Sequence, residues 1–167
     1  MSEPLLEHLA SLRDHALDDV LPPHHPTCLG CGPDAEQGFH LAVRRDGDDV
    51  VTEHLFEQRH SGGPGIAHGG AVATVFDDVL GHLLHVARVP GVTRHLEVEY
   101  LRPVLVGVRY ALRARLESRD GRKLWTSGTC TAPDGTVAAT ARGLFIAVDA
   151  AHFRDAVGPA DRARVDP

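Results

Sequence analysis

Residues 68–87 are the segment that most constrains the fold of this 167-residue chain. The segment is apolar on nearly every side at helical spacing, and such a helix is stable only when other structure encloses it. After it the pattern changes to a period of two, because residues 108–117 alternate apolar with mostly charged side chains, as a half-buried strand does. Similar runs cover about 92–102, 122–132 and 136–148. The sequence therefore predicts an antiparallel sheet whose apolar face is covered by one buried helix.

Segments before the helix extend this arrangement. Strand candidates at residues 39–45 and 49–56 flank the turn Asp46-Gly47-Asp48 and predict a hairpin. A Gly-rich loop over residues 57–67 leads into the central helix. Apolar residues at helical spacing predict a further, short amphipathic helix that ends before Pro22-Pro23.

The fold class predicted from this order is α+β. One long helix wrapped by a curved antiparallel sheet of about five to six strands is the hot-dog architecture. We expect it to occupy residues 22–148, between the short N-terminal helix in residues 1–21 and a polar, Ala-rich C-terminal tail over residues 149–167. A chain with 43% hydrophobic residues has enough core for one such domain.

The charge of the chain argues against nucleic acid as a partner. The formal net charge is −6, the isoelectric point is near 6.0, and the 17 basic residues are scattered along the sequence. No apolar run approaches the roughly 20 residues that cross a bilayer, and the first four residues do not resemble a secretory signal. We therefore expect a cytoplasmic protein that binds neither nucleic acid nor a membrane.

Three cysteines, Cys28, Cys31 and Cys130, are expected to be reduced thiols, because a domain of this size does not need disulfides. Two of them form a Cys-x-x-Cys, which suggests a zinc site with His25 or His40 as further ligands. Strongly predictive zinc patterns pair two such motifs, and here there is one. A tight Gly-rich turn explains the same residues, so we expect no metal.

The central helix begins with His68-Gly69-Gly70. The first backbone N–H groups of a helix have no partner within it, and two glycines let a ligand atom approach them without meeting a Cβ. The helix dipole adds to the attraction for negative charge. These residues predict a site for a carbonyl oxygen that gains negative charge during attack.

Two carboxylates, Asp77 and Asp78, interrupt the apolar helix two turns later. Asp78 shares its stripe with polar residues that can satisfy a carboxylate: Thr74, His82 and His85. Asp77 shares its stripe with apolar residues: Ala73, Leu80 and Leu84. An acid on an apolar stripe costs several kcal/mol unless it is paired or protonated, so we expect Asp77 to be functional.

Helix geometry separates Gly70 from Asp77 by roughly 10 Å along the axis, at about 1.5 Å per residue. One helix therefore cannot bring both groups to one carbonyl carbon. An antiparallel second copy would place its Asp77 near the glycine start of the first, so we expect a site built across a homodimer interface.

The residues from His68 to Asp77 and the later Tyr100-Leu101-Arg102-Pro103 resemble the hot-dog thioesterases of the phenylacetate-degradation (PaaI-like) branch. Residues 68–81, 93–103 and Gly121-Arg122-Lys123 are also similar to the carboxyl-terminal modulator type of acyl-CoA thioesterase. The resemblance covers about residues 28–148.

This resemblance implies catalytic roles for four residues. Gly70 supplies the N–H to the thioester oxygen, and Asp77 of the partner subunit activates water as a general base or attacks as a nucleophile. His68 shapes the acyl pocket or orients the carbonyl, although a histidine at this position is equally typical of a simple helix cap. Thr93 matches a residue that holds the lytic water, but strand parity turns it away from the helix unless a bulge intervenes.

Further residues are expected to contact the substrate. They are a helix glycine, two apolar residues of the acyl pocket, the second aspartate and three cations for coenzyme A phosphates: Gly69, Val72, Phe76, Asp78, Arg102, Arg122 and Lys123. Arg142 is one more candidate for the phosphates. Some relatives carry an Asn where this chain has Gly62, and His60 is a candidate to replace that contact.

The predicted function is hydrolysis of an acyl-CoA or related acyl thioester by a homodimer, or by a tetramer of paired dimers. No cofactor is expected apart from the coenzyme A of the substrate. Two alternatives use the same fold: a non-catalytic acyl-CoA-binding protein, which needs no acid at Asp77, and a hydratase or dehydratase, which needs a catalytic His paired with an acid at other spacings.

Overall fold

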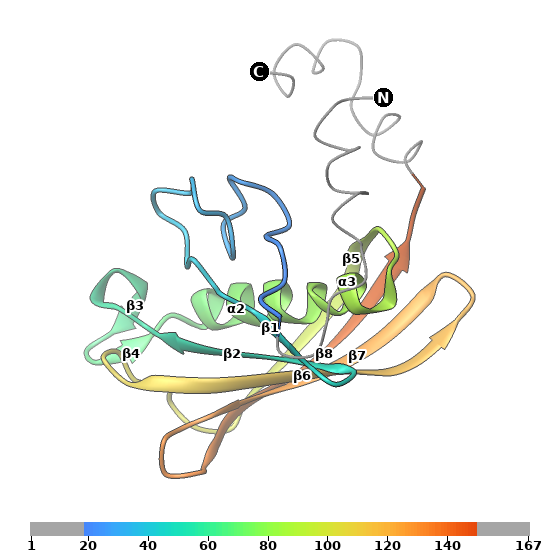
Figure 1. Cartoon of the computed structure of the whole chain (residues 1–167). Coiled ribbons are helices and arrows are strands. Elements are labelled where there is room, and N and C mark those ends of the chain that lie inside the picture. The colour runs from blue at the N-terminus through green and yellow to red at the C-terminus, as the bar shows by residue number, and fades with distance from the viewer. Residues whose placement is uncertain (1–18, 150–167) are drawn as a thin grey trace.

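The computed structural model describes residues 19–149 (Figure 1). The predicted C-terminal tail lies outside these residues except for Asp149, and the predicted N-terminal helix lies outside them up to residue 18. The last positions of that predicted helix are described and are not helical, because Val20 forms an isolated antiparallel bridge with Arg44. No helix within residues 19–149 is both long and apolar enough to span a bilayer.

The main sheet has six antiparallel strands and curves around one helix (Figure 1). Its order is β1-β2-β6-β7-β8-β5. In chain order the strands are β1 (Arg44–Asp46), β2 (Asp49–Leu55), β5 (Gly91–Tyr100), β6 (Arg109–Asp120), β7 (Lys123–Thr131) and β8 (Val137–Ala147). The predicted hairpin and the four predicted C-terminal strands are all present. The sequence did not predict that β5 returns to the far edge of the sheet, beside β8.

The central helix is α2 (Gly69–Gly81), and a short helix α3 (Leu83–Ala87) continues it. His82 separates the two, and Arg88 ends α3 in the left-handed region at φ 56°. Apolar side chains of α2 lie against the sheet with almost no exposed surface: Val72, Val75, Phe76, Val79 and Leu80. This confirms the predicted hot-dog fold, a buried helix that packs on the apolar face of a curved antiparallel sheet.

The segment between β2 and α2 is more ordered than the loop predicted for residues 57–67. It contains a 3₁₀ turn (Gln58–His60) and a small hairpin of β3 (Ser61–Gly63) and β4 (Ile66–Ala67). Gly65 turns this hairpin at φ +71°, a backbone conformation that glycine adopts without strain. The hairpin lies beside the start of α2 (Figure 1).

Residues 21–43 cover the face of α2 that points away from the sheet (Figure 1). This cover segment contains no helix or strand. It is tied at its base by the hydrogen bond from the Leu21 N–H to the Val43 carbonyl, 2.9 Å, and within by a bond of the same length from the Leu41 N–H to the Gly30 carbonyl. Helix α2 therefore lies between two layers, the sheet and the cover segment.

Candidate functional site

The start of α2 brings the three predicted residues of the His-Gly-Gly motif together. His68 is the N-cap, and its Nδ1 accepts a hydrogen bond from the Gly70 N–H at 2.8 Å. The Tyr100 hydroxyl donates to the Gly69 carbonyl at 2.7 Å, so the end of β5 is fastened to the first turn of the helix. The predicted donor, the Gly70 N–H, is thus held by the cap.

A cavity of about 400 Å³ opens beside this helix start. Its lining includes Gly69, Val72, Tyr100 and Arg102. Three of the predicted substrate contacts therefore share one cavity, in which the walls are mostly apolar and a cation stands at the end of β5.

Asp77 points into a second cavity, of about 480 Å³, whose lining includes Thr93 and Leu96 of β5. The Thr93 hydroxyl donates to Asp77 Oδ1 at 2.9 Å. Thr93 reaches the helix because the pairing of β5 with β8 shifts register between Thr93 and His95, which is the bulge that strand parity required. Burial raises the pKa of Asp77, while the Thr93 hydrogen bond opposes that shift.

Asp78 points to the cover segment, and it also belongs to the lining of the Asp77 cavity. It is 7% exposed and meets three side chains of that segment, which together with it form the Cys–His–Asp cluster: His24, Cys28, Cys31 and Asp78. Its Oδ1 lies 3.1 Å from His24 Nδ1 and 3.3 Å from Cys28 Sγ. Its Oδ2 lies 3.5 Å from Nδ1 of the buried His82.

The electrostatics of the cluster follow from these contacts. Burial opposes ionisation of Asp78, but the hydrogen bond and charge of His24 outweigh it and lower the pKa of the carboxyl group. Hydrogen bonds with Cys31 and His24 lower the pKa of Cys28 to about 4. The cluster therefore favours a thiolate at Cys28 beside the Asp78 carboxylate, while the hydrogen bond with Cys28 and burial raise the pKa of Cys31.

Two predicted residues lie elsewhere than expected. Phe76 is 1% exposed and packs against β7, where a Cβ at Gly128 would lie 3.5 Å from its ring, so it belongs to the core and lines neither cavity. His60 is buried too, and its ring stacks on Phe39 with centroids 4.5 Å apart. His60 thus cannot replace the Asn of relatives, and a Cβ at Gly62 would lie 2.7 Å from His68 Cα, so an Asn has no room there.

The cations proposed for coenzyme A phosphates divide between the two ends of the sheet. Arg102 follows Tyr100, which pairs with Ala139, whereas Lys123 pairs with Ile146. Seven residues of β8 separate these positions, or roughly 23 Å at about 3.3 Å per residue. Arg122 is beside Lys123, and its Nε donates to the Ala147 carbonyl at 3.0 Å. One protomer therefore does not gather the three cations around one cavity.

The two histidines considered as zinc ligands point away from the cysteines. His25 Nδ1 lies 2.9 Å from the Thr27 hydroxyl, and His40 Nδ1 lies 3.0 Å from the Gly32 carbonyl. The histidine that does reach the cysteines is His24, which sequence reasoning passed over because nothing in the spacing separates it from its neighbour His25. Tyr100 was also missed as a contact of the helix start, although it belongs to the recognised Tyr-x-Arg-Pro motif.

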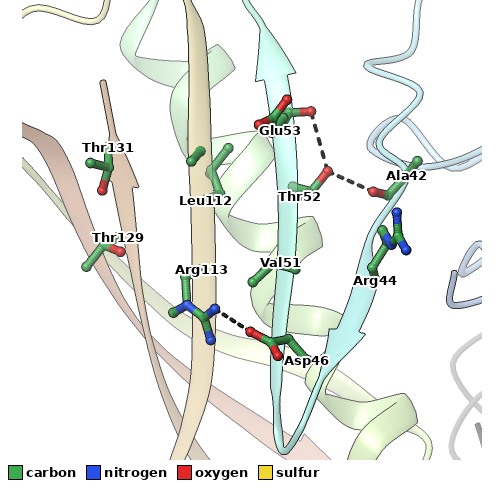
Figure 2. Close-up of a pocket in the computed structure, with 11 residues that line it drawn as sticks. Ala42, Arg44, Asp46, Val51, Thr52, Glu53, Leu112, Arg113, Thr129 and Thr131 are labelled. Carbon is green, nitrogen blue, oxygen red and sulfur yellow. Dashed lines mark hydrogen bonds and ion pairs between the residues drawn. The ribbon is translucent and has the colours of Figure 1, made fainter. Parts of the chain in front are cut away.

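A wider hollow, of about 920 Å³, lies on the face of the sheet opposite α2 (Figure 2). Its lining includes exposed side chains of β2 and β6, such as Glu53 and Arg113. Arg113 forms ion pairs there with Asp46 and Asp49. No residue predicted to act on a substrate lines this hollow, so volume alone does not identify the site.

The sequence of this chain is similar to those of known thioesterases. Residues 64–139 match the model of the family described as thioesterase superfamily. Acyl-coenzyme A thioesterase THEM4 of Bos taurus is 33% identical over 115 residues, which cover 67% of this chain and 47% of the bovine protein. The chain thus matches just under half the length of that relative.

Solved structures share the fold. A crystal structure of a thioesterase superfamily protein superposes with a TM-score of 0.67 at 26% identity, over 85% of this chain and 73% of the other. The Escherichia coli PaaI protein of the phenylacetic acid degradation operon gives a TM-score of 0.62 at 14% identity, over 66% and 81%. A hypothetical thioesterase of Streptococcus pneumoniae, solved with coenzyme A, gives 0.61 at 17% identity, over 65% and 85%.

Proposed function

Because residues 64–139 match the thioesterase superfamily model and the described residues have the hot-dog fold, we propose that this chain hydrolyses an acyl-CoA, or a related acyl thioester, to the free acid and thiol. The observation that carries the proposal is the pair of Asp77 and Thr93 at a cavity beside a helix that starts with two glycines. The bovine relative is named as an acyl-CoA thioesterase, and the Streptococcus pneumoniae protein of the same fold was solved with coenzyme A. Both support an acyl-CoA substrate.

Asp77 is proposed to act as the general base. The Thr93 hydroxyl and the Asp77 carboxylate hold a water between them and the thioester carbon. Asp77 takes a proton from this water while the water oxygen attacks the thioester carbon. Burial raises the pKa of Asp77 and so makes its carboxylate a stronger base. When the C–S bond breaks, the proton passes from Asp77 to the leaving thiolate. Direct attack by the carboxylate is the other route: it expels the thiolate and forms a mixed anhydride with Asp77. If water then opens the anhydride at the aspartyl carbon, one turnover in ¹⁸O-labelled water leaves a solvent oxygen in Asp77.

The oxyanion that forms during attack is proposed to accept from the Gly70 N–H. In the free protein that N–H donates to His68 Nδ1. The carbonyl oxygen therefore replaces the imidazole nitrogen as acceptor, and His68 turns aside to contact the acyl group. Donors of this kind typically contribute about 10²- to 10³-fold to the rate, because they stabilise charge that develops only in the transition state.

The site is proposed to be completed by a second copy of the chain. Strand β5 pairs with β8 on one side and has no strand on its other side within residues 19–149. Around the same edge and the start of α2, large apolar side chains are exposed: Ile66, Tyr100 and Leu101. Antiparallel pairing of two such edges would bring the partner's Asp77 toward Gly70, and would bring cations from both ends of the two sheets around one coenzyme A.

The free thiols of Cys28, Cys31 and Cys130 support the proposal that the protein works in the reducing cytoplasm.

Thiol release from short, long and aromatic acyl-CoAs is the test of the proposed function. We expect turnover with at least one substrate class, and sedimentation of the active species as a dimer or a tetramer. Absence of thiol release from every acyl-CoA and from acyl carrier protein thioesters, with binding retained, would replace the proposal with a non-catalytic acyl-CoA-binding protein.

A further inference from the structure

The Cys–His–Asp cluster joins the cover segment to α2 at the face of the helix opposite the sheet. Its four ligand atoms, two thiol sulfurs, one imidazole nitrogen and one carboxylate oxygen, all lie within 4.8 Å of one another. Three of the separations are short: Nδ1 of His24 to Oδ1 of Asp78 is 3.1 Å, Cys28 Sγ to the same oxygen is 3.3 Å, and Cys31 Sγ to His24 Nδ1 is 3.3 Å. The same nitrogen and the same oxygen recur in these contacts, so the atoms converge on one point.

Three of the six separations, at 3.1–3.3 Å, are close to those of a tetrahedral zinc shell, and the others are at most 4.8 Å. Bonds of about 2.3 Å to sulfur and about 2.0–2.2 Å to nitrogen or oxygen require roughly 3.3–3.8 Å between neighbouring ligand atoms. Two sulfurs, one nitrogen and one oxygen are also a donor set that zinc prefers, whereas magnesium and calcium prefer oxygen alone.

The local backbone is built around this convergence. A Cβ at Gly30 would lie 2.3 Å from Asp78 Cγ, so only a glycine between the two cysteines lets the carboxylate approach. The Cys28 carbonyl accepts from the Gly32 N–H at 2.8 Å, which closes a tight turn over the motif. The His24 N–H donates to Cys31 Sγ at 3.2 Å, which ties the start of the segment to the second cysteine. The Gly-rich turn that contains Cys28 and Cys31 thus directs two sulfur atoms toward one carboxylate.

We propose that His24, Cys28, Cys31 and Asp78 bind one zinc ion. His24 ligates through Nδ1, the cysteines through Sγ and Asp78 through Oδ1. Four protein ligands fill the shell and leave no position for a substrate, so the site is structural. His82, which is 1% exposed, lies behind the site, with its Nδ1 2.8 Å from the Asp78 carbonyl oxygen and 3.5 Å from Asp78 Oδ2.

The zinc ion would fix the cover segment, whose 23 residues contain no helix or strand, to the central helix. Cys28, Leu29 and Gly30 also form one wall of the Asp77 cavity. The metal therefore holds a wall of the proposed catalytic cavity without touching the substrate. Loss of zinc is expected to raise KM more than it lowers kcat.

Metal content of the purified full chain, expressed without a polyhistidine tag, tests this proposal. Elemental analysis of the wild type is expected to give about one zinc per chain, a stoichiometry set by a single four-ligand shell. Cys31→Ser and His24→Gln should lose most of it. The matched controls are Cys130→Ser, a buried cysteine on β7, and His25→Gln, the neighbour of His24; both should retain full zinc.

A measurement on the wild type avoids dependence on folded variants. Cobalt(II) exchanged into the protein should give the visible absorption of a tetrahedral ion with thiolate ligands. The proposal is overturned if zinc-supplemented wild type contains no metal and takes up no cobalt, or if Cys31→Ser retains as much zinc as Cys130→Ser. A Cys28–Cys31 disulfide in protein purified under reducing conditions would overturn it as well. None of these readouts depends on thioester hydrolysis.

Discussion

Asp77 and Asp78 are adjacent on α2, yet their surroundings give them opposite chemical properties. Asp77 faces β5 and a cavity, Thr93 donates to it, and burial raises its pKa. Asp78 faces the cover segment, is 7% exposed, and has contacts with His24 that outweigh burial and lower its pKa. Because consecutive helical residues point about 100° apart, a helix between two layers can present one carboxylate to each.

The comparison separates a reactive carboxylate from a satisfied one, whose Oδ1 has His24 and Cys28 as partners although its buried Oδ2 accepts no hydrogen bond within residues 19–149. A buried acid with few partners costs stability, and that cost is retained where the acid has a chemical task. A buried acid with several partners stabilises the structure that provides them, and removing it leaves those partners uncompensated. The same isosteric substitution at the two positions should therefore change different properties of the protein.

Asp77→Asn is expected to have the largest effect on the reaction. The amide cannot accept a proton from water, so kcat should fall about 100-fold or more, with a stable fold and full zinc content. Initial rates of thiol release, corrected for the three native cysteines, measure the change. Equal turnover in the variant and the wild type would show that Asp77 is not part of the mechanism. The contrast between Asp77 as a reactive carboxylate and Asp78 would then be wrong.

Asp78→Asn is expected to have the largest effect on stability. Loss of the carboxylate removes a zinc ligand and leaves His24 without its charged partner, which should cost about 2 kcal/mol, or a fall in Tm of roughly 4–8 °C. Differential scanning calorimetry with parallel metal analysis measures both. A chelator should lower the Tm of the wild type in the same direction and leave that of Asp78→Asn nearly unchanged.

Asp77→Asn is the matched control for this stability change, because it alters the neighbouring residue in the same way. Its Tm should equal or exceed that of the wild type, since the substitution removes a poorly compensated charge. If the two variants lose the same stability, the contrast between a reactive and a satisfied carboxylate is wrong.

The fold was largely predictable from the sequence because its signals are local. Period-two alternation in β6 and an apolar helix at residues 69–81 each follow from burial of one element on another. The position of β5 at the sheet edge was not predictable, because strand order depends on contacts between residues far apart in the chain. The β3–β4 hairpin was missed because its strands are only three and two residues long.

The site was predictable only in part. The different stripes of Asp77 and Asp78 could be read from helical spacing. The bulge that lets Thr93 reach the helix could not be predicted from strand parity, which turns Thr93 away. His24 could not be distinguished from His25 by sequence, because the choice depends on how the cover segment folds over α2. The position of Asp78 beside Cys28, 50 residues earlier in the chain, likewise depends on the tertiary fold and not on any local spacing.

Thr93→Val sharpens the description of the reactive carboxylate. Valine keeps the shape of threonine and removes the hydroxyl that donates to Asp77 Oδ1. Because one hydrogen bond of this kind is worth about 1–1.5 kcal/mol, kcat should fall about 10-fold while zinc content is unchanged. Thr129→Val, on the face of β7 away from the helix, is the matched control and should keep wild-type rates. A loss of activity as large in Thr129→Val as in Thr93→Val would show that the effect is not local to Asp77.

His54 is expected to give a smaller, acid-dependent loss of stability that belongs to neither aspartate. It lies on β2, is 8% exposed, and its ring meets that of Phe56 edge-on. Burial lowers the pKa of His54 to about 4. The charged or titratable groups around it are His60, Glu57, Arg59 and Arg109. The unfolded chain has the ordinary pKa near 6.5 and binds a proton more readily, so this contribution to stability is complete above about pH 6.5 and is lost as the pH falls toward 4.

Urea unfolding of His54→Phe between these two pH values should show a weaker pH dependence than the wild type. The same difference should remain when both proteins carry Asp78→Asn, because His54 is not part of the Cys–His–Asp cluster. If Asp78→Asn alone removes all of the acid sensitivity, protonation of the cluster accounts for it, and the satisfied carboxylate controls stability over the whole acid range.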